Sequence, residues 1–232
     1  MKYEYKEAGL TCNDFIQKLK LKYNNKIAYT ARLDPMAQGI VPILIGDECM
    51  NINNMCNTNK KYRVKVILGI KTDSDDPLGL IQNINMTNNI DSFINENKCK
   101  FECNDIIINQ KFHYFSTKAL KKRKQGNTND SFHQVKLYKS KIINYGTLNF
   151  NEWRDNIITI IKKVDPCNYN RFRQKEIIEM WENISMDNIP FFELELDVSS
   201  GFFVRQFIAD FNMNLMCFDI NRISVYNIND EN

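Results

Sequence analysis

The stretch YTARLDPMAQGIVP, which runs from Tyr29 to Pro42, places an aspartate in a turn directly before an apolar segment. Because Pro35 disfavours the helical region for the residue before it, Asp34 is expected in an extended or turn conformation. The apolar run from Gly39 to Gly46 is bounded by glycines, which predicts a buried or edge strand. An aspartate held rigidly beside such a strand suits a nucleophilic carboxylate, although an Asp-Pro pair more often serves only to make a turn.

On both sides of this stretch the sequence pattern predicts more strands than helices. Alternating apolar and polar residues from Phe192 to Val198 give the clearest strand, with one face buried. Further strands are expected at residues 62–68, 106–118 and 135–143, and helices at 15–23, within 151–188 (two, divided at Asp165-Pro166) and from Val204 to Leu215. Since the strands mostly follow one another, we expect an α+β fold on a mixed, largely antiparallel sheet flanked by helices and loops.

Composition sets limits on the kinds of protein that this chain can be. Its 232 residues are 43% hydrophobic, which fits one folded domain with a sizeable core, and we expect a monomer. The formal net charge of +3 permits binding to a polyanion but does not demonstrate it. Seven cysteines without a CxxC pair, and only two histidines, make a metal site improbable and favour free thiols in a reducing compartment. Without an apolar segment of signal-peptide or membrane-spanning length, we expect a soluble, cytoplasmic protein.

Three further side chains could share a site with Asp34. Arg205 follows the clearest strand, in the first turn of a predicted helix, from where a guanidinium could reach a carboxylate and keep it ionised. Tyr62 and Phe203 are aromatics beside polar turns that could hold an unstacked base, and a tyrosine hydroxyl could also relay a proton. A solvated helix arginine and two core aromatics are the alternatives.

A cluster of positive charge follows an aromatic segment in the middle of the chain. Lys121, Lys122, Arg123 and Lys124 lie in a segment, residues 121–129, that we interpret as a flexible basic loop. The aromatic residues at 112–115 stand just before it. RNA-binding segments combine charge and stacking surface in this way, although a solvated lysine loop has the same composition.

The order of these signals resembles the TruB family of tRNA pseudouridine synthases. The stretch from Tyr29 to Pro42 is similar to that family's HTGxLDPxAxGVLP around the catalytic aspartate. Six other segments are similar to family motifs in the same order: residues 6–14 to KPxGxxSND, 61–63 to KxY, 72–76 to TDTxD, 110–118 to QxPPxYSAxK, 199–205 to CSxGTYIR and 222–225 to LRRLxV. The resemblance extends from residue 6 to residue 225.

The resemblance implies a pseudouridine synthase fold in which residues 1–232 form a single catalytic domain with a thumb-like RNA-binding loop. Asp34 would attack the flipped nucleotide, at the base or at the ribose, Tyr62 would stack on the base and serve in proton transfer, and Arg205 would pair with Asp34. No metal or other cofactor would be needed. The residues expected to bind or support the substrate are Tyr29, Phe203, Lys6, Asp76, Lys121, Lys122, Arg123 and Lys124.

The sequence also departs from the family pattern. Tyr29 replaces a histidine that wedges into the RNA loop, and residues 111–113 replace a proline pair. The segment after Lys118 is shorter and more basic than the family's thumb loop. Residues 151–188 have no counterpart that we can place, and we interpret them as a helical insertion. Because the chain ends soon after Val225, we expect no C-terminal RNA-binding PUA domain.

The implied function is isomerisation of a uridine in the T-arm loop of tRNA, of the uridine-55 type. The expected partner is tRNA or a tRNA-like stem-loop RNA, with no membrane. One alternative is an RNA-binding helper of tRNA folding with weak or lost catalysis. Another is the same chemistry on a different cellular RNA, guided by partner proteins.

Overall fold

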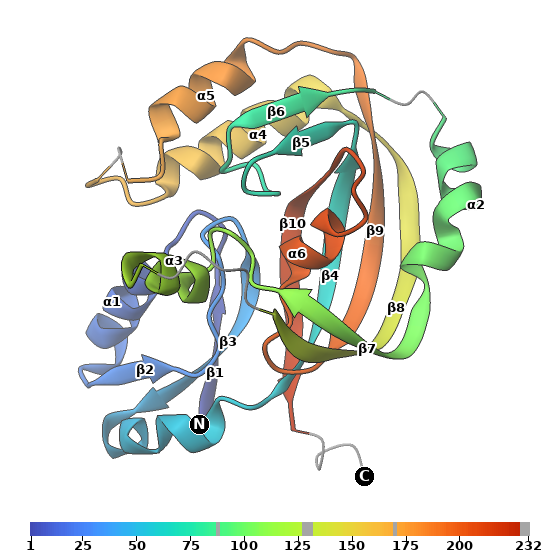
Figure 1. Cartoon of the computed structure of the whole chain (residues 1–232). Helices are drawn as coiled ribbons and strands as arrows, with labels where there is room; N and C mark the ends of the chain where they lie inside the picture. Colours follow the sequence, from blue (N-terminus) through green and yellow to red (C-terminus); the bar gives the residue numbers. More distant parts are fainter. Residues whose placement is uncertain (87–88, 127–131, 169–170, 228–232) are drawn as a thin grey trace.

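A mixed eight-stranded sheet forms the centre of the molecule (Figure 1). This computed structural model describes residues 1–86, 89–126, 132–168 and 171–227. Strand order is β1-β3-β10-β4-β9-β8-β7, with β2 added to β3, and of these neighbours only β3 and β10 run parallel. The strands are β1 (Lys2–Lys6), β2 (Ile27–Tyr29), β3 (Gln38–Ile45), β4 (Asn59–Leu68), β7 (Cys103–Lys111), β8 (Phe132–Asn149), β9 (Asn188–Val198) and β10 (Leu215–Tyr226). The α+β prediction is confirmed.

Helices and a small two-stranded hairpin lie around this sheet. They are α1 (Cys12–Tyr23), α2 (Ile90–Phe101), α3 (Thr117–Lys124), α4 (Phe150–Lys163), α5 (Gln174–Glu182) and α6 (Val204–Ala209), with a 3-10 helix η1 (Gly46–Met55) and the hairpin β5 (Ile70–Thr72) and β6 (Ile81–Ile84). In Figure 1, α4, α5 and the hairpin gather at one end of the sheet, and α2 and α3 lie on opposite sides of the view. Within the described ranges, no helix combines the length and apolar character needed to cross a membrane.

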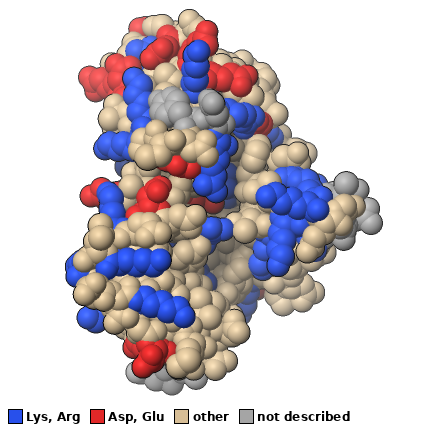
Figure 2. Space-filling model, turned by 90° about the vertical axis from the view of Figure 1, so that its left-hand side faces the viewer, with Lys and Arg blue, Asp and Glu red and all other residues tan. Residues whose placement is uncertain are grey.

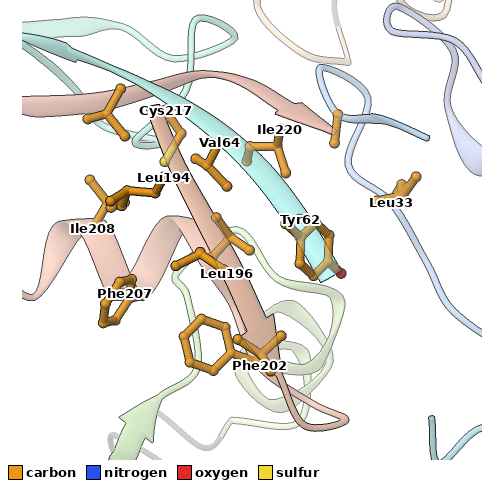
Figure 3. Packing of buried hydrophobic residues seen from close by; sticks show 14 of the residues in the cluster. Leu33, Tyr62, Val64, Leu194, Leu196, Phe202, Phe207, Ile208, Cys217 and Ile220 are labelled. Atoms are coloured by element: carbon orange, nitrogen blue, oxygen red, sulfur yellow. The ribbon is translucent and has the colours of Figure 1, made fainter. Parts of the chain in front are cut away.

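The main core forms where β4, β9 and β10 meet α6 (Figure 3). Alternate residues of a strand point to the same face, so Val64 of β4 and its partner Leu194 of β9 are both buried. Phe207 and Ile208 of α6 pack against this layer. Each fully buried side chain of this size contributes roughly 1.5–3 kcal/mol, so the core fixes α6 firmly against the sheet.

The two helices expected within residues 151–188 are present, and their segment contacts the acidic turn at residues 72–77. The ring nitrogen of Trp181 on α5 donates to the carbonyl of Pro77 at 3.1 Å. Arg173, directly before α5, holds both carboxylate oxygens of Asp73, at 2.7 and 3.1 Å. The helical pair therefore fixes the acidic turn at 72–77 from outside. That the pair is a family-specific insertion stays a prediction.

Three predictions about local structure are wrong. The strand predicted at 106–118 ends at Lys111, because the chain turns at 113–116, where Ser116 N–H donates to the carbonyl of His113, and Thr117 begins α3. Residues 121–124 form the second half of α3 instead of a loop, because Ser116 caps the helix by accepting from Ala119 N–H and Lys and Arg are good helix formers. Residues 127–129 of the predicted loop lie outside the described residues. The helix from Val204 ends at Ala209, because Asn212 adopts a left-handed φ of 55° that turns the chain, and Leu215 begins β10.

Gly39 lets β3 and β10 approach each other beside the Asp34 turn. Its φ is +120°, and a Cβ atom there would lie 2.4 Å from the carbonyl oxygen and 2.6 Å from the nitrogen of Arg222. Both the backbone conformation and the space therefore require glycine.

We predict that Gly39→Ala lowers the free energy of unfolding by about 2–4 kcal/mol, from backbone strain together with overpacking. Gly146→Ala is the matched control, because its Cβ would meet only an ordinary contact, 3.8 Å from the Phe191 ring. Urea unfolding of both variants measures the difference. Equal stability of the two variants would contradict this account of Gly39.

Candidate active site

The turn that carries Asp34 is held by backbone hydrogen bonds and by a buried lysine. Ala37 N–H donates to the carbonyl of Asp34 at 3.1 Å, and Gly9 N–H donates to that of Pro35 at 2.9 Å. The fully buried ammonium of Lys6 donates to the carbonyls of Ala37, at 2.7 Å, and Pro35, at 3.4 Å. Burial lowers the pKa of Lys6 to about 8. Lys6 therefore fixes the turn from behind and does not line the pocket beside Asp34.

Arg222 secures the chain on both sides of the same turn. Its guanidinium donates to the carbonyls of Ile40 at 2.6 Å, Ala31 at 3.0 Å and Arg32 at 3.1 Å, and the residue is 1% exposed. Sequence reasoning assigns no site role to Arg222. Its position could have indicated that it is buried. Arg222 lies on β10 two residues after the buried Ile220, so its side chain projects from the same inward face of the strand.

Arg205 joins the Asp34 turn to the acidic turn. One terminal nitrogen lies 2.7 Å from an oxygen of Asp34, and the other lies 2.9 Å from an oxygen of Asp76. The second nitrogen also donates to the carbonyl of Ser74 at 2.7 Å. The Arg205 and Asp76 side chains are 8% and 5% exposed, whereas that of Asp34 is 42% exposed. The expected pairing of Arg205 with Asp34 is present, and only Asp34 offers its carboxylate to solvent.

The pKa values of the two carboxyl groups that share Arg205 are shifted in opposite directions. Burial raises the pKa of Asp34, but Arg205, with His113 and Lys6, outweighs burial, so the pKa lies below its ordinary value. Burial raises the pKa of Asp76 and nearby Asp34 adds to this, so that it stays above its ordinary value despite Arg205. Environments that separate the pKa values of two acids in this way are typical of catalytic sites. Asp34 is thus the accessible member of the pair, and its pKa is the lowered one.

A pocket of about 410 Å³ opens beside Asp34. Its size lies within the range of sites that enclose a small ligand. Figure 2 shows the molecular surface hollowed beside a lobe rich in Lys and Arg side chains. Figure 3 shows Tyr62 extending from β4 beside the apolar cluster. The side chains that could act chemically in the lining come from Asp34, Lys60, Tyr62, His113, Ser116, Phe203, Arg205 and Arg222.

Phe203 is placed in this lining by a fully buried glutamine. Gln110 donates its amide N–H to the carbonyl of Phe203 at 2.9 Å and accepts from Phe203 N–H at 2.8 Å. The Phe203 ring meets the edges of Phe112 and His133 at centroid distances of 5.9 and 5.6 Å, and those two rings stack on each other at 4.4 Å. The aromatic wall of the pocket is therefore held from β7, β8 and α6 together.

His113 lines the pocket, although the sequence places it only in the aromatic segment at 112–115 and among the departures from the family pattern. Phe115 N–H donates to His113 Nδ1 at 3.3 Å, which assigns the hydrogen to Nε2. Nε2 then donates to Asp75 at 3.2 Å, and the histidine is 2% exposed. This hydrogen bond ties the segment before α3 to the acidic turn that holds Asp76.

Besides Lys6 and the basic residues at 121–124, two of the expected site residues do not line the pocket. Asp76 stands behind it, in contact with Arg205. Tyr29, at the end of β2, faces a second hollow between α1 and η1, with the Arg32 guanidinium 5.8 Å from its ring centre. Tyr62, Phe203, Arg205 and Asp34 are the expected residues that the structure brings together in one pocket.

The expected basic residues lie on α3, near the mouth of the pocket. Lys118, which lines the pocket, and Lys122 each place the ammonium 5.2 Å from the centre of the Phe112 ring. The Arg123 guanidinium lies 3.6 Å from the ring centre of Tyr114, which is 61% exposed. Lys121 and Lys124 are exposed. Charge and aromatic surface are therefore combined on one helix.

The cysteines are free thiols, and Cys12, Cys49 and Cys217 are buried. Burial and the nearby carboxylate of Asp75 raise the pKa of Cys217 well above its ordinary value, so this side chain stays a thiol at neutral pH. In the part of the chain that the structure describes, no group of three or more His, Cys, Asp or Glu side chains is arranged to hold a metal ion.

Comparison with solved structures supports the fold. A chain in the crystal structure of a Cbf5-Nop10-Gar1 complex superimposes with a TM-score of 0.52 over 95% of this chain and 47% of that chain. The sequence identity is 12%, so the likeness concerns the fold alone.

Comparison with known sequences supports the family. The chain is 39% identical over 77 residues to tRNA pseudouridine synthase B of Cronobacter sakazakii and 40% identical over 77 residues to that of Serratia proteamaculans. Each match covers 33% of this chain and 24% of the relative, so the chain spans about a quarter of the length of these relatives. Residues 17–151, more than half of the chain, match the family model of the TruB family pseudouridylate synthase (N terminal domain). The chain therefore belongs to the TruB family of pseudouridylate synthases.

Proposed function

We propose that this protein isomerises uridine to pseudouridine in the T-arm loop of tRNA, at the uridine-55 position, with Asp34 as the nucleophile. The observation that carries the proposal is the accessible Asp34 carboxylate, held in its ionised form by buried Arg205 at the side of a pocket large enough for one nucleotide. Membership of the TruB family supports the reaction. The name of the bacterial relatives, tRNA pseudouridine synthase B, supports tRNA as the substrate.

The proposed reaction is an isomerisation and needs no net redox change. The bond from N1 to C1′ of the ribose breaks, the base rotates, and C5 forms a new bond to C1′. The hydrogen on C5 leaves as a proton, and N1 gains a proton. A carboxylate that forms a transient covalent bond with the nucleotide divides this change into easier steps. Asp34 takes that role because its pKa is lowered and its side chain reaches the pocket.

Aromatic side chains in the pocket would receive the flipped base. Enzymes that act on a base inside a folded RNA take it out of its stack and hold it between apolar or aromatic groups. Tyr62 and Phe203 both line the pocket and come from different elements, β4 and the start of α6. We infer that the Tyr62 ring contacts the base and that its hydroxyl serves in proton transfer.

The stem of the RNA would lie against α3. Because the net charge of the chain is only +3, binding to a polyanion depends on where positive charge is concentrated. Figure 2 shows such a concentration on the lobe beside the hollow. The last turn of α3 carries Lys121, Lys122, Arg123 and Lys124. Aromatic rings beneath Lys122 and Arg123 add surface on which bases can stack.

We predict that Asp34→Asn lowers the rate of pseudouridine formation by about 10⁴-fold or more, since the variant keeps the shape but removes the nucleophile. Affinity for RNA should stay within a few-fold. Asp47→Asn, the same change at an exposed carboxylate, is the control and should retain full activity. Pseudouridine mapping on an unmodified tRNA transcript measures the rate, and turnover near that of the wild type would remove Asp34 from the reaction.

The wild-type protein in the same assay separates the proposal from its rivals. Product at the T-loop supports the uridine-55 activity. A bound transcript without product would favour an RNA-binding helper of tRNA folding. Pseudouridine at another position, or only in another RNA, would support the proposed reaction but contradict the proposed substrate.

A second prediction concerns α3. Replacing Lys121, Lys122, Arg123 and Lys124 with glutamine should weaken RNA binding and flatten its dependence on salt, by about 0.7–0.9 in log–log slope for each phosphate that is no longer neutralised. Glutamine is chosen because it preserves the helix. The control replaces four exposed lysines on α2 and β8, far from α3 in Figure 1: Lys98, Lys100, Lys139 and Lys141. An equal effect of the two sets would mean that the RNA lies elsewhere.

A further inference from the structure

Lys60 is a buried cation of the pocket lining that the proposed reaction leaves without a role. It is 6% exposed, and its ammonium donates to the carbonyl of Thr58. Burial, with the adjacent guanidinium of Arg222, lowers the pKa of Lys60 to about 8. Among the ion pairs of the described residues, neither Lys60 nor Arg222 has a carboxylate partner.

The charges beside the pocket fall into two groups. In the first, the two carboxylates of Asp34 and Asp76 surround the single guanidinium of Arg205. In the second, Lys60 and Arg222 place two cations together with backbone carbonyls as their acceptors. A desolvated charge without a counter-charge is costly, so an RNA phosphate that supplied the counter-charge would stabilise this group of cations.

A polar group without a partner adjoins Lys60. The hydroxyl of Thr58 is buried and has no hydrogen-bond partner within the described structure. Thr58 does not line the pocket, so the contact with the acceptor oxygens of a phosphate falls to the Lys60 ammonium, which retains unused donor capacity. Arg222 has its guanidinium occupied by three carbonyls, so it contributes charge and leaves the direct contact to Lys60.

The position of Lys60 on its strand fits a nucleotide in the pocket. Lys60 and Tyr62 are two residues apart on β4, so both side chains project from the same face, about 7 Å apart along the strand. That spacing is comparable with the separation of a nucleobase from its own phosphate. A base held against Tyr62 can therefore place its backbone within reach of the flexible lysine side chain.

We propose that Lys60 binds an RNA phosphodiester next to the flipped nucleotide and so anchors the backbone while the base enters the pocket. The inference rests on the proposed function, since it requires RNA in this pocket. It adds a contact that acts on binding and does not require Lys60 to take part in the chemical steps.

The first test compares RNA affinity across salt concentrations for Lys60→Met and Lys65→Met, both in the Asp34→Asn background so that bound RNA is not converted. Lys65 is the matched control because it lies on the same strand with its side chain on the opposite face. Lys60→Met should lose about tenfold or more in affinity for a T-arm stem-loop. Its salt slope should fall by about 0.7–0.9, while Lys65→Met keeps the original slope. An unchanged slope in Lys60→Met overturns the proposal.

The second test locates the phosphate. Stem-loop RNAs are prepared with one uncharged methylphosphonate at each linkage around the target uridine. With Lys60 present, one particular methylphosphonate should weaken binding, because it removes the charge that the ammonium contacts. In Lys60→Met that same substitution should have no further effect. Equal weakening in both proteins at every linkage would overturn the proposal.

Two further readouts separate phosphate binding from other roles of Lys60. Methionine fills a similar volume and removes an unpaired buried charge, so the Tm of Lys60→Met should be no lower than that of the wild type. A lower Tm with unchanged RNA affinity would mean a structural role, and unchanged affinity with lost turnover in the presence of Asp34 would mean proton transfer; both overturn the proposal. Failure of the proposed function would appear instead as full turnover by Asp34→Asn.

Discussion

The site depends on one buried guanidinium that two carboxylates share. Burial removes the Arg205 guanidinium from water, and its two carboxylate partners offset that cost. Asp76 satisfies it from the buried side and Asp34 from the pocket side. Burial raises the pKa of Asp76 above its ordinary value, and nearby Asp34 adds to this rise, whereas Arg205 holds the pKa of the accessible Asp34 below its ordinary value. The same ion pair that accommodates Arg205 in the fold thus also favours the ionised form of Asp34.

Every segment that contributes to this interaction is held from a second direction. Lys6 and Arg222 fix the Asp34 turn through backbone carbonyls. Arg173 and Trp181, from the helical pair, fix the acidic turn. The core beneath α6 fixes Arg205 itself. Such bracing keeps the groups in position without relying on the substrate, which is what a preorganised site requires.

The sequence predicted the features that depend on local pattern. The alternation in β9, the helix α1 and the turn at Asp34 follow from rules that act over a few residues, and all three are present. The site residues that were missed depend on contacts between distant segments. His113 acquires its place through Asp75, and Arg222 through the loop around Asp34. The helix α3 was missed because it has no apolar stripe: none of its residues is buried, and its stability comes from capping and propensity.

The most direct measurement of the central claim is a carbon-detected NMR titration of the Asp34 carboxyl group, assigned by the signal that disappears in Asp34→Asn. The account predicts that this carboxyl stays ionised as the pH falls through about 3.9, the ordinary value for aspartate, and titrates only below it. A midpoint at or above that value would contradict the account, because Arg205 would then not be holding Asp34 as an ionised nucleophile.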